Sequence, residues 1–444
     1  MPTEDSQERS QLFRERSFWG LTCTQFLGAF NDNLYKQLML LLAIATPTIV
    51  VVGEAPETGS DVQGWAAFVF SLPFVLFSGF AGYLSDKYSK TPIIVLCKVA
   101  EIVIMFMGML AFLYFEVFGQ WGTWVVLFLM GTQSSFFGPG KYGILPELFP
   151  PHDLARANGI ILMTTFLAII FGIVLAGGLY DVLVGDSDST ENLWRGLIVC
   201  VGIAVIGTLT SLLVRRVPAA QPGSKLTMDC WGVSNEVRNM LTSDRPLLIA
   251  LCVSSVFWMV AGLAAPTVNR LGLEMLAVNK TQTSLLTASI GIGIMIGALA
   301  AGWLCRGGHG DRLVTIGLWG IFLSLLSLGF WKPNDEHLLG FSGSVVALIA
   351  LGVFAAVYSI PLQVFLQERP PSNLKGRLIA TMNQANFVGI LLAGPLYQGF
   401  ESLARGCNWP VSSVFWMTGL LVLPLAAFYR LRSQAETASI VANR

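Results

Sequence analysis

Long hydrophobic stretches alternate with short polar segments along the whole chain. A helix needs roughly 20 apolar residues to cross the hydrocarbon core of a bilayer, and about a dozen stretches come close to that length. They lie near 18–45, 64–84, 91–114, 121–142, 157–181, 195–214, 246–268, 282–304, 313–331, 342–366, 377–400 and 410–430. Because these stretches are continuously apolar, with no alternation of polar and apolar residues, they predict an all-α polytopic membrane protein with 12 transmembrane helices rather than a β-barrel.

A polar interval at 215–245 divides the chain into two halves of six predicted helices. Within it, the spacing of Val233, Val237 and Leu241 predicts a short amphipathic helix at the membrane surface. We therefore expect a cytoplasmic N-terminal segment (1–17), a first six-helix half (18–214), a cytoplasmic linker (215–245), a second half (246–430) and a cytoplasmic tail (431–444).

The two halves repeat a short pattern at one nearly constant offset, which is the sign of an internal duplication. The offset is 220 or 221 positions, in the loops after the second and fourth helix of each half. Two halves related by an axis along the membrane normal are typical of alternating-access carriers, where the substrate binds near the midplane. The matched positions are Gly82 with Gly302, Glu147 with Glu368, Pro150 with Pro370, and Arg156 with Arg377.

Composition supports the same class of protein. Hydrophobic residues make up 54% of the chain and charged residues only 12%, about half of what a soluble domain carries. A water-soluble enzyme is thereby excluded, and the 29 Phe and 12 Trp exclude a disordered chain. Lys plus Arg and Asp plus Glu both number 27, so no net charge points to a nucleic-acid partner.

The basic residues are distributed unevenly between the two sides of the membrane. Placing the N-terminus in the cytoplasm leaves few lysines and arginines in the outer loops, as the positive-inside rule requires. Those few are Arg195, Arg270, Lys280, Lys332 and Arg405. We therefore expect a multi-pass protein of a bacterial inner membrane with both termini in the cytoplasm.

The motifs of enzymes and pumps are missing from the sequence. It contains neither a Walker phosphate loop nor a G-x-S-x-G nucleophile motif, so neither ATP-driven transport nor catalysis is expected. The 7 cysteines show no C-x-x-C spacing, and His152, His309 and His337 lie in separate loops. We expect a transporter without a cofactor or a structural metal.

Several motifs carry a resemblance to a known family. The run from Gly82 to Lys90 resembles the loop 2–3 signature of the major facilitator superfamily. Nearly the whole chain is similar to bacterial lysophospholipid transporters, especially the transporter half of fusions with phospholipid acyltransferases. The residues that carry this likeness are 25–37, 137–147, Ala157-Asn158-Gly159, Pro361 to Gln363, Leu366 to Glu368, Gly376-Arg377 and Asn383.

The resemblance implies a secondary carrier that moves lysophospholipids toward the cytoplasmic leaflet, coupled to Na⁺ or H⁺, and supplies a separate acyltransferase. One departure bears on the substrate. Some of these transporters place an arginine in helix 7 where this chain has Gly262-Leu-Ala-Ala265. If that arginine binds the lipid phosphate, Lys36 must take its place here, or the substrate differs.

Asp32 is the leading candidate for the coupling residue. It lies in the middle of the first helix between Asn31 and Asn33, and charges inside spanning helices are costly enough to suggest a function. A carboxylate beside amide oxygens offers hard ligands for a small cation such as Na⁺, or a site for a proton. The alternative is a structural pair with Lys36, one turn further on.

Other polar residues in the helices are candidates for the substrate cavity. Lys36 either attracts a substrate phosphate or neutralises Asp32. Lys98 and Glu101 are three positions apart, so they either neutralise each other or contribute to the cavity or gate. Gln363 and Asn383 are candidates for a mildly polar cavity wall, with Phe257 and Trp258 among the apolar wall residues.

A cytoplasmic gate is expected at the repeated loops. The resemblance implies that Asp86 caps the start of the eleventh helix near Arg377, where the helix dipole favours an anion. A pseudo-equivalent contact would join Asp311 and Arg312 to the region of Arg156. The alternative is a solvated loop whose charges only set the topology. The candidate gate residues are Gly82, Asp86, Lys87, Lys90, Glu147, Arg156, Glu368 and Arg377.

Two other functions fit the sequence. A major facilitator exporter of drugs or other small amphiphilic solutes would share the fold and the mixed polar and apolar cavity. A non-transporting membrane partner of an acyltransferase would need no gate, so the repeated gate motifs argue against it.

Overall fold

The computed structural model describes residues 12–43, 62–184, 192–220, 222–223, 232–233, 235–304, 310–334, 336–371 and 374–431. The chain divides into two compact units. Unit 1 comprises Met1–Gly59 and Val69–Gly232, and unit 2 comprises Ser60–Phe68 and Val233–Arg444.

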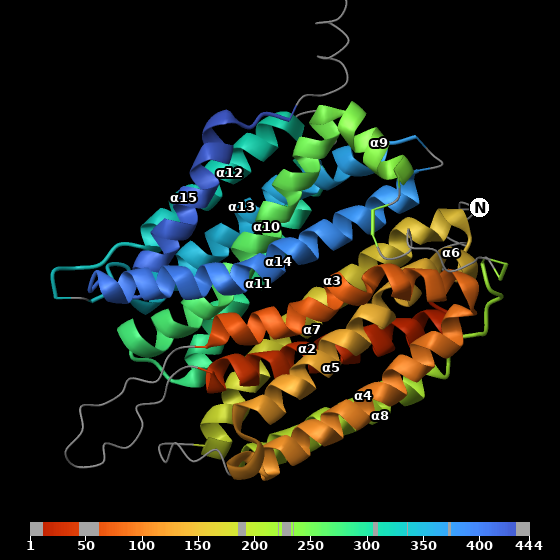
Figure 1. Cartoon of the computed structure of the whole chain (residues 1–444), viewed down its shortest axis with the longest axis horizontal. Helices are drawn as coiled ribbons and strands as arrows, with labels where there is room; N and C mark the ends of the chain where they lie inside the picture. Colours follow the sequence, from red (N-terminus) through yellow and green to blue (C-terminus); the bar gives the residue numbers. More distant parts are fainter. Residues whose placement is uncertain are drawn as a thin grey trace, which may run out of the picture. The chain divides into compact units, whose positions relative to one another are not determined.

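Unit 1 is built from long helices that pack side by side. Helix α2 packs against α7 and α8, and α4 packs against α5 and α8 (Figure 1). The short α6 connects α5 to α7, and the first turns of α3 belong to unit 2. The helices are α2 (Arg16–Leu42), α3 (Gln63–Lys87), α4 (Lys90–Leu113), α5 (Phe115–Gly143), α6 (Leu145–Leu148), α7 (Pro151–Val184) and α8 (Leu193–Ser211).

Unit 2 is also helical and opens with a short helix from the central linker. Helix α10 packs against α14, while α13 lies between α11 and α12, and α12 also packs against α15 (Figure 1). Its elements are α9 (Asn235–Ser243), α10 (Arg245–Arg270), the π-helical turn η4 (Leu271–Met275), α11 (Lys280–Leu304), α12 (Gly310–Leu328), α13 (Gly340–Glu368), α14 (Lys375–Gly406) and α15 (Ser413–Phe428).

The all-helical prediction is confirmed for the described residues, and most helix limits lie within a few positions of the hydrophobic stretches. Three helices extend six residues past a predicted limit: α5 begins at Phe115 instead of 121, α7 begins at Pro151 instead of 157, and α14 ends at Gly406 instead of 400. Helix α5 also contains Gly119 at a φ of 54°. Only glycine adopts that conformation cheaply, and its non-helical backbone joins two helical segments of α5 across a kink. The predicted linker helix corresponds to α9, whose Val237 and Leu241 are buried in the core of unit 2.

Glycines let neighbouring helices approach closely. A Cβ added at Gly172 of α7 would lie 2.5 Å from the carbonyl oxygen of Phe30 on α2. In unit 2, a Cβ on Gly293 of α11 would collide with the carbonyl oxygen of Ile349 on α13. Small residues at such crossings are the usual way for helices to pack in a membrane, where water supplies no hydrophobic driving force.

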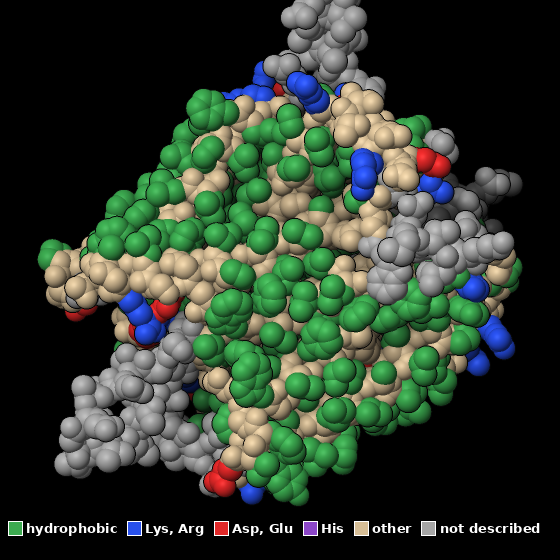
Figure 2. Space-filling model, viewed as in Figure 1, with side chains coloured by type: hydrophobic (Ala, Val, Ile, Leu, Met, Phe, Trp, Pro, Cys, Tyr) green, Lys and Arg blue, Asp and Glu red, His purple; other side chains and the backbone are tan. Residues whose placement is uncertain are grey.

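The outer faces of the helices are apolar. Figure 2 shows hydrophobic side chains over most of the face in view, with lysines, arginines and acids toward its edges. Exposed large side chains include Val182, Leu299 and Phe428. Eight helices in the described part are long and apolar enough to span a membrane. Such a surface suits lipid rather than water.

Candidate functional site

Three consecutive polar residues on α2 have three different environments. Successive side chains on a helix point about 100° apart, so they cannot all face one neighbour. Asn31 is fully buried toward the interior of unit 1, and Asp32 is half-buried. Asn33 donates to the carbonyl oxygen of Ala29 on its own helix at 2.8 Å. The interior polar cluster therefore includes Asn31 and Asp32 but not Asn33.

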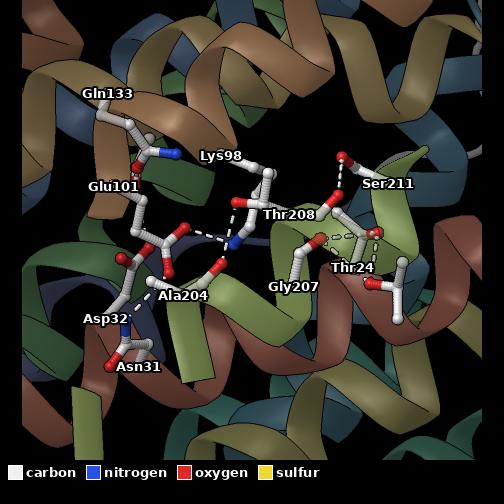
Figure 3. Close-up of polar contacts among 12 residues, drawn as sticks. Thr24, Asn31, Asp32, Lys98, Glu101, Gln133, Ala204, Gly207, Thr208 and Ser211 are labelled. Atoms are coloured by element: carbon white, nitrogen blue, oxygen red, sulfur yellow. Dashed lines mark hydrogen bonds and ion pairs between the residues drawn. The ribbon is translucent and has the colours of Figure 1, made fainter. Parts of the chain in front are cut away.

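Lys98 and Glu101 of α4 form an ion pair inside unit 1, and each side chain is only 1% exposed. Two glycines on neighbouring helices make room for the lysine. A Cβ on Gly28 of α2 would lie 2.9 Å from Lys98 Nζ, and one on Gly207 of α8 would lie 3.0 Å from Lys98 Cε. The pair is thus enclosed between α2 and α8 (Figure 3), which favours the self-neutralised interpretation over a residue pair that lines an open cavity.

Asn31 of α2 connects the ion pair on α4 to α8. Its Nδ2 donates to Glu101 Oε1 on α4 at 2.9 Å and to the carbonyl oxygen of Cys200 on α8 at 3.2 Å (Figure 3). Both amide hydrogens are therefore used within the interior. Asn31 Oδ1 is buried and has no donor among the described residues.

Asp32 contacts a different helix through one carboxylate oxygen. Ser134 Oγ of α5 lies 2.6 Å from Asp32 Oδ2, to which it can donate, and 3.1 Å from Gln133 Oε1. The other oxygen, Oδ1, is buried and accepts no hydrogen bond in the part of the chain that is described. A buried carboxylate oxygen without a donor is costly unless a proton, a water or a cation satisfies it.

Lys36 does not form the structural pair with Asp32 that the sequence offered as an alternative. No ion pair joins the two within the described residues, and the Lys36 ammonium instead lies 5.5 Å from the centre of the Phe70 ring on α3. Asp32 is thus a carboxylate with one hydroxyl donor and no salt-bridge partner in the described structure. The Asp32 oxygen that lacks a hydrogen-bond donor is suited to bind a proton or a monovalent cation. No cluster of three or more His, Cys, Asp or Glu residues suited to a metal occurs in the described ranges.

The other predicted cavity residues lie in unit 2. Gln363 on α13 is partly buried and Asn383 on α14 is exposed. No hydrogen bond joins the two in the described part of the chain, and both stay candidates for a cavity wall. Asn386, one turn beyond Asn383, is buried and lies 3.4 Å from the hydroxyl of Ser254 on α10.

The predicted gate residues of unit 1 gather at the junction of α3, α4 and α6. Lys90 at the start of α4 forms an ion pair with Glu147 of α6. Lys87, five positions after Gly82 at the end of α3, donates to the Tyr83 hydroxyl at 2.8 Å. Asp86 is exposed beside them. The expected contact between Asp86 and the start of α14 would join the two units and stays a prediction.

The described gate residue of unit 2 and its neighbours form ion pairs within that unit, which leaves the expected contacts with unit 1 as predictions. Arg377 of α14 forms an exposed ion pair with Glu236 of α9. Arg369, just after α13, forms an ion pair with Asp244, with Nε 2.6 Å from the carboxylate. Asp244 also caps α10, because its side chain accepts a hydrogen bond from the Leu247 amide. The side chains of Arg156 and Glu368 fall outside the described residues.

Some functional candidates were not evident from the sequence. Ser134 was not singled out, and the role of the Cys200 carbonyl leaves no side-chain signal at all. Arg270 was expected in an outer loop, whereas the structure buries it at the end of α10. There it contacts Glu274 through two 2.6 Å bonds and Glu401 of α14 at 3.1 Å.

Comparison with known proteins identifies the family to which the chain belongs. The profile described as Major Facilitator Superfamily matches residues 12–394. The lysophospholipid transporter LplT of Yersinia pestis (strain Pestoides F) is 26% identical over 391 residues, which cover 86% of both chains. The lysophospholipid transporter LplT of Yersinia pseudotuberculosis serotype O:3 (strain YPIII) has the same identity and coverage.

Solved structures share the fold at low sequence identity. The POT family transporter PepTSo superposes with a TM-score of 0.72 at 12% identity, over 93% of this chain and 96% of its own. The nucleoside transporter NupG gives a TM-score of 0.64 at 13% identity, over 92% and 97%.

Proposed function

Because the chain belongs to the Major Facilitator Superfamily and is a transporter rather than an enzyme, we propose that it carries lysophospholipids across the inner membrane toward the cytoplasmic leaflet. The observation that carries the substrate class is the likeness to LplT over 86% of both chains. An amphiphile with one charged head and one chain also matches the mixed polar and apolar helix faces. The transport cycle would be alternating access between the two six-helix halves.

We further propose that Asp32 is the coupling site for H⁺ or Na⁺. Support comes from its position in a spanning helix, from the unpaired Oδ1, and from the lack of an ion pair with Lys36. Lys98 and Glu101 neutralise each other, so their charges cancel inside unit 1. The carboxylate of Asp32 is left as the group whose charge a transported cation can balance.

Uptake of radiolabelled lysophosphatidylethanolamine into spheroplasts tests both proposals. We expect uptake in wild type, with dependence on a sodium or proton gradient, and at least a tenfold loss of that dependence in Asp32→Asn. Glu116→Gln is the matched control, since Glu116 is an exposed acid at the start of α5.

The outcomes separate the two proposals. Uptake that survives Asp32→Asn with its gradient dependence intact would remove Asp32 from coupling but keep the substrate. Absence of uptake from a folded, inserted wild-type protein would refute the lipid assignment, and an export assay with amphiphilic drugs would then test the second major facilitator function. Co-purification with an acyltransferase, assayed in the same membranes, tests the proposed partner.

A further inference from the structure

Lys36 is a charged residue in a spanning helix, and no carboxylate pairs with it in the described ranges. It lies one turn after Asp32 on α2, where residues four apart share a face of the helix. Its ammonium lies 5.5 Å from the centre of the Phe70 ring on α3. The ring attracts the positive charge, but an ammonium has three hydrogen-bond donors that still require acceptors. Lys36 is only partly buried, so a ligand can reach it.

Three helices of unit 1 meet at Lys36 and Asp32. Ser134 of α5 contacts Asp32 at 2.6 Å. Gly131, about one turn earlier on α5, faces α3, because a Cβ there would collide with the carbonyl oxygen of Phe70. The contacts of the acid and of the lysine are thus a turn apart on α5, as the two residues themselves are on α2. Asp32 and Lys36 therefore belong to one site.

Two further lysines of unit 1 lie against the Phe137 ring of α5. The ammonium groups of Lys98 and Lys141 are each 5.8 Å from its centre. Lys98 is already in the buried ion pair, and Lys141 lies in the last turn of α5. Lys36 is therefore the lysine that shares a helix face with Asp32.

The opposite charges of Asp32 and Lys36 act on each other although no ion pair joins them in the described structure. Residues four apart on a helix have Cβ atoms about 5–6 Å apart, and a Coulomb interaction persists over that distance where protein and lipid replace water. The Asp32 carboxylate therefore competes with any other anion for the Lys36 ammonium. When a proton or a monovalent cation neutralises Asp32, Lys36 is left as an uncompensated charge, which is costly in a membrane. An anion supplied by a ligand removes that cost.

We propose that Lys36 binds the phosphate of the lysophospholipid once a cation has neutralised Asp32. The proposal rests on the proposed function, both the transport of lysophospholipids and the coupling role of Asp32, and adds how the two binding events are linked. The cation and the phosphate bind one helical turn apart and bring opposite charges, so each favours the binding of the other. The site therefore selects amphiphiles that carry a phosphate over those that do not.

Removing the ammonium tests the phosphate part. Lys36→Met should weaken binding of lysophosphatidylethanolamine to the purified full-length protein in nanodiscs by about tenfold or more, the loss expected for a hydrogen bond to a charged group. Binding of a monoacylglycerol with the same chain, which has no phosphate, should change by less than about twofold. Lys36→Arg keeps the positive charge and should keep the preference for the phosphate-bearing lipid. Equal losses for the two amphiphiles in Lys36→Met would overturn the phosphate site.

Two other lysines provide comparisons for Lys36→Met. Lys332→Met is the surface control, because Lys332 is exposed and pairs with Glu336. Lys141→Met removes another ammonium that lies over a phenyl ring of unit 1. Both should keep the preference for lysophosphatidylethanolamine over the monoacylglycerol. Loss of the preference in Lys141→Met but not in Lys36→Met would assign the phosphate to Lys141 and overturn the role of Lys36.

Neutralising Asp32 permanently tests the linkage. In Na⁺-free buffer at about pH 8.5, where both candidate cations are scarce, Asp32→Asn should bind lysophosphatidylethanolamine at least about fivefold more tightly than wild type, the lower end of typical coupling between two sites. Adding the coupling cation should remove the difference, since residue 32 is then neutral in both proteins. Combining Asp32→Asn with Lys36→Met should abolish the gain. Equal affinities of wild type and Asp32→Asn without the cation would refute the linkage.

A measurement on wild-type protein covers the case in which the variants do not fold. A lysophospholipid with an aldehyde in place of its head-group amine forms an imine with a nearby lysine, and borohydride reduces the imine to a stable amine. Mass spectrometry should find this label on Lys36, and unlabelled lysophosphatidylethanolamine should prevent it. Labelling confined to other lysines would refute the site.

Two further outcomes separate the proposals. Displacement of the lipid by inorganic phosphate alone, at similar concentrations, would assign Lys36 to a free phosphate and overturn its role in lipid binding. A wild type that neither binds nor takes up lysophospholipid would instead refute the proposed function, which keeps the two failures distinct.

Discussion

Glu101 compensates a buried lysine, and this role can be tested by removing one charge or both. Glu101→Gln leaves Lys98 charged and unpaired in the interior, which should lower the free energy of unfolding by about 3–5 kcal/mol. Replacing the pair together, as Lys98→Met with Glu101→Leu, removes both charges and should restore most of that loss. Reversible unfolding in detergent micelles measures the free energy of unfolding of both variants.

The free energies of unfolding of the Glu101→Gln variant and of the double variant distinguish charge balance from hydrogen bonding. A double variant no more stable than Glu101→Gln would show that the pair contributes through its contact with Asn31, not through charge balance.

Close helix crossings in unit 2 depend on the absence of a side chain at single positions of α11. Gly293→Ala would place a Cβ against the backbone of Ile349, which cannot rotate away, so α11 and α13 must separate. We expect a loss of about 1–3 kcal/mol in the free energy of unfolding. Gly202→Ala on the exposed face of α8 should be neutral or stabilising by up to about 1 kcal/mol, because alanine favours a helix. Equal effects at both positions would contradict the close-packing interpretation.

The connection between α12 and α13 contains a histidine that should make stability depend on pH. His337 is buried, its Nε2 lies 2.9 Å from the Leu328 carbonyl oxygen, and its Nδ1 lies 3.2 Å from the Ser344 hydroxyl. Burial lowers the pKa of His337 below its usual 6.5, although the bond to Leu328 partly offsets this. The folded protein thus holds the neutral ring, while the unfolded chain binds a proton near the usual pKa.

Stability from this residue is therefore present above about pH 6.5 and lost as the pH falls below it. Thermal unfolding of wild type between about pH 8 and about pH 5 should show the decline, and His337→Gln should flatten it. An identical pH dependence in the two proteins would assign the effect to other groups.

Across the whole molecule, the helices were predictable because a bilayer leaves few alternatives. Runs of apolar residues long enough to span it must form helices, so the hydrophobic stretches and the described helices nearly coincide. The pairing of Lys98 with Glu101 was also accessible, since residues three apart on a helix are neighbours. The kink at Gly119 in α5 could not be predicted, because the conformation of a glycine depends on its surroundings.

The long-range contacts of the site were not predictable from one sequence. Asn31 meets Glu101 across 70 positions and Ser134 meets Asp32 across 102, and no local pattern encodes either distance. Hydrophobic periodicity identifies such residues as facing the interior but does not reveal which of them meet.

Gly28, Gly207 and Lys98 have a consequence for how this sequence can diverge. The two glycines supply the volume that the lysine occupies, so the three positions form one steric unit. A lineage that acquires alanine at position 28 or 207 must shift the end of the Lys98 side chain, and the ion pair with the acid at 101 must shift with it. These four positions are therefore expected to covary among homologues, with small residues at 28 and 207 wherever the lysine persists.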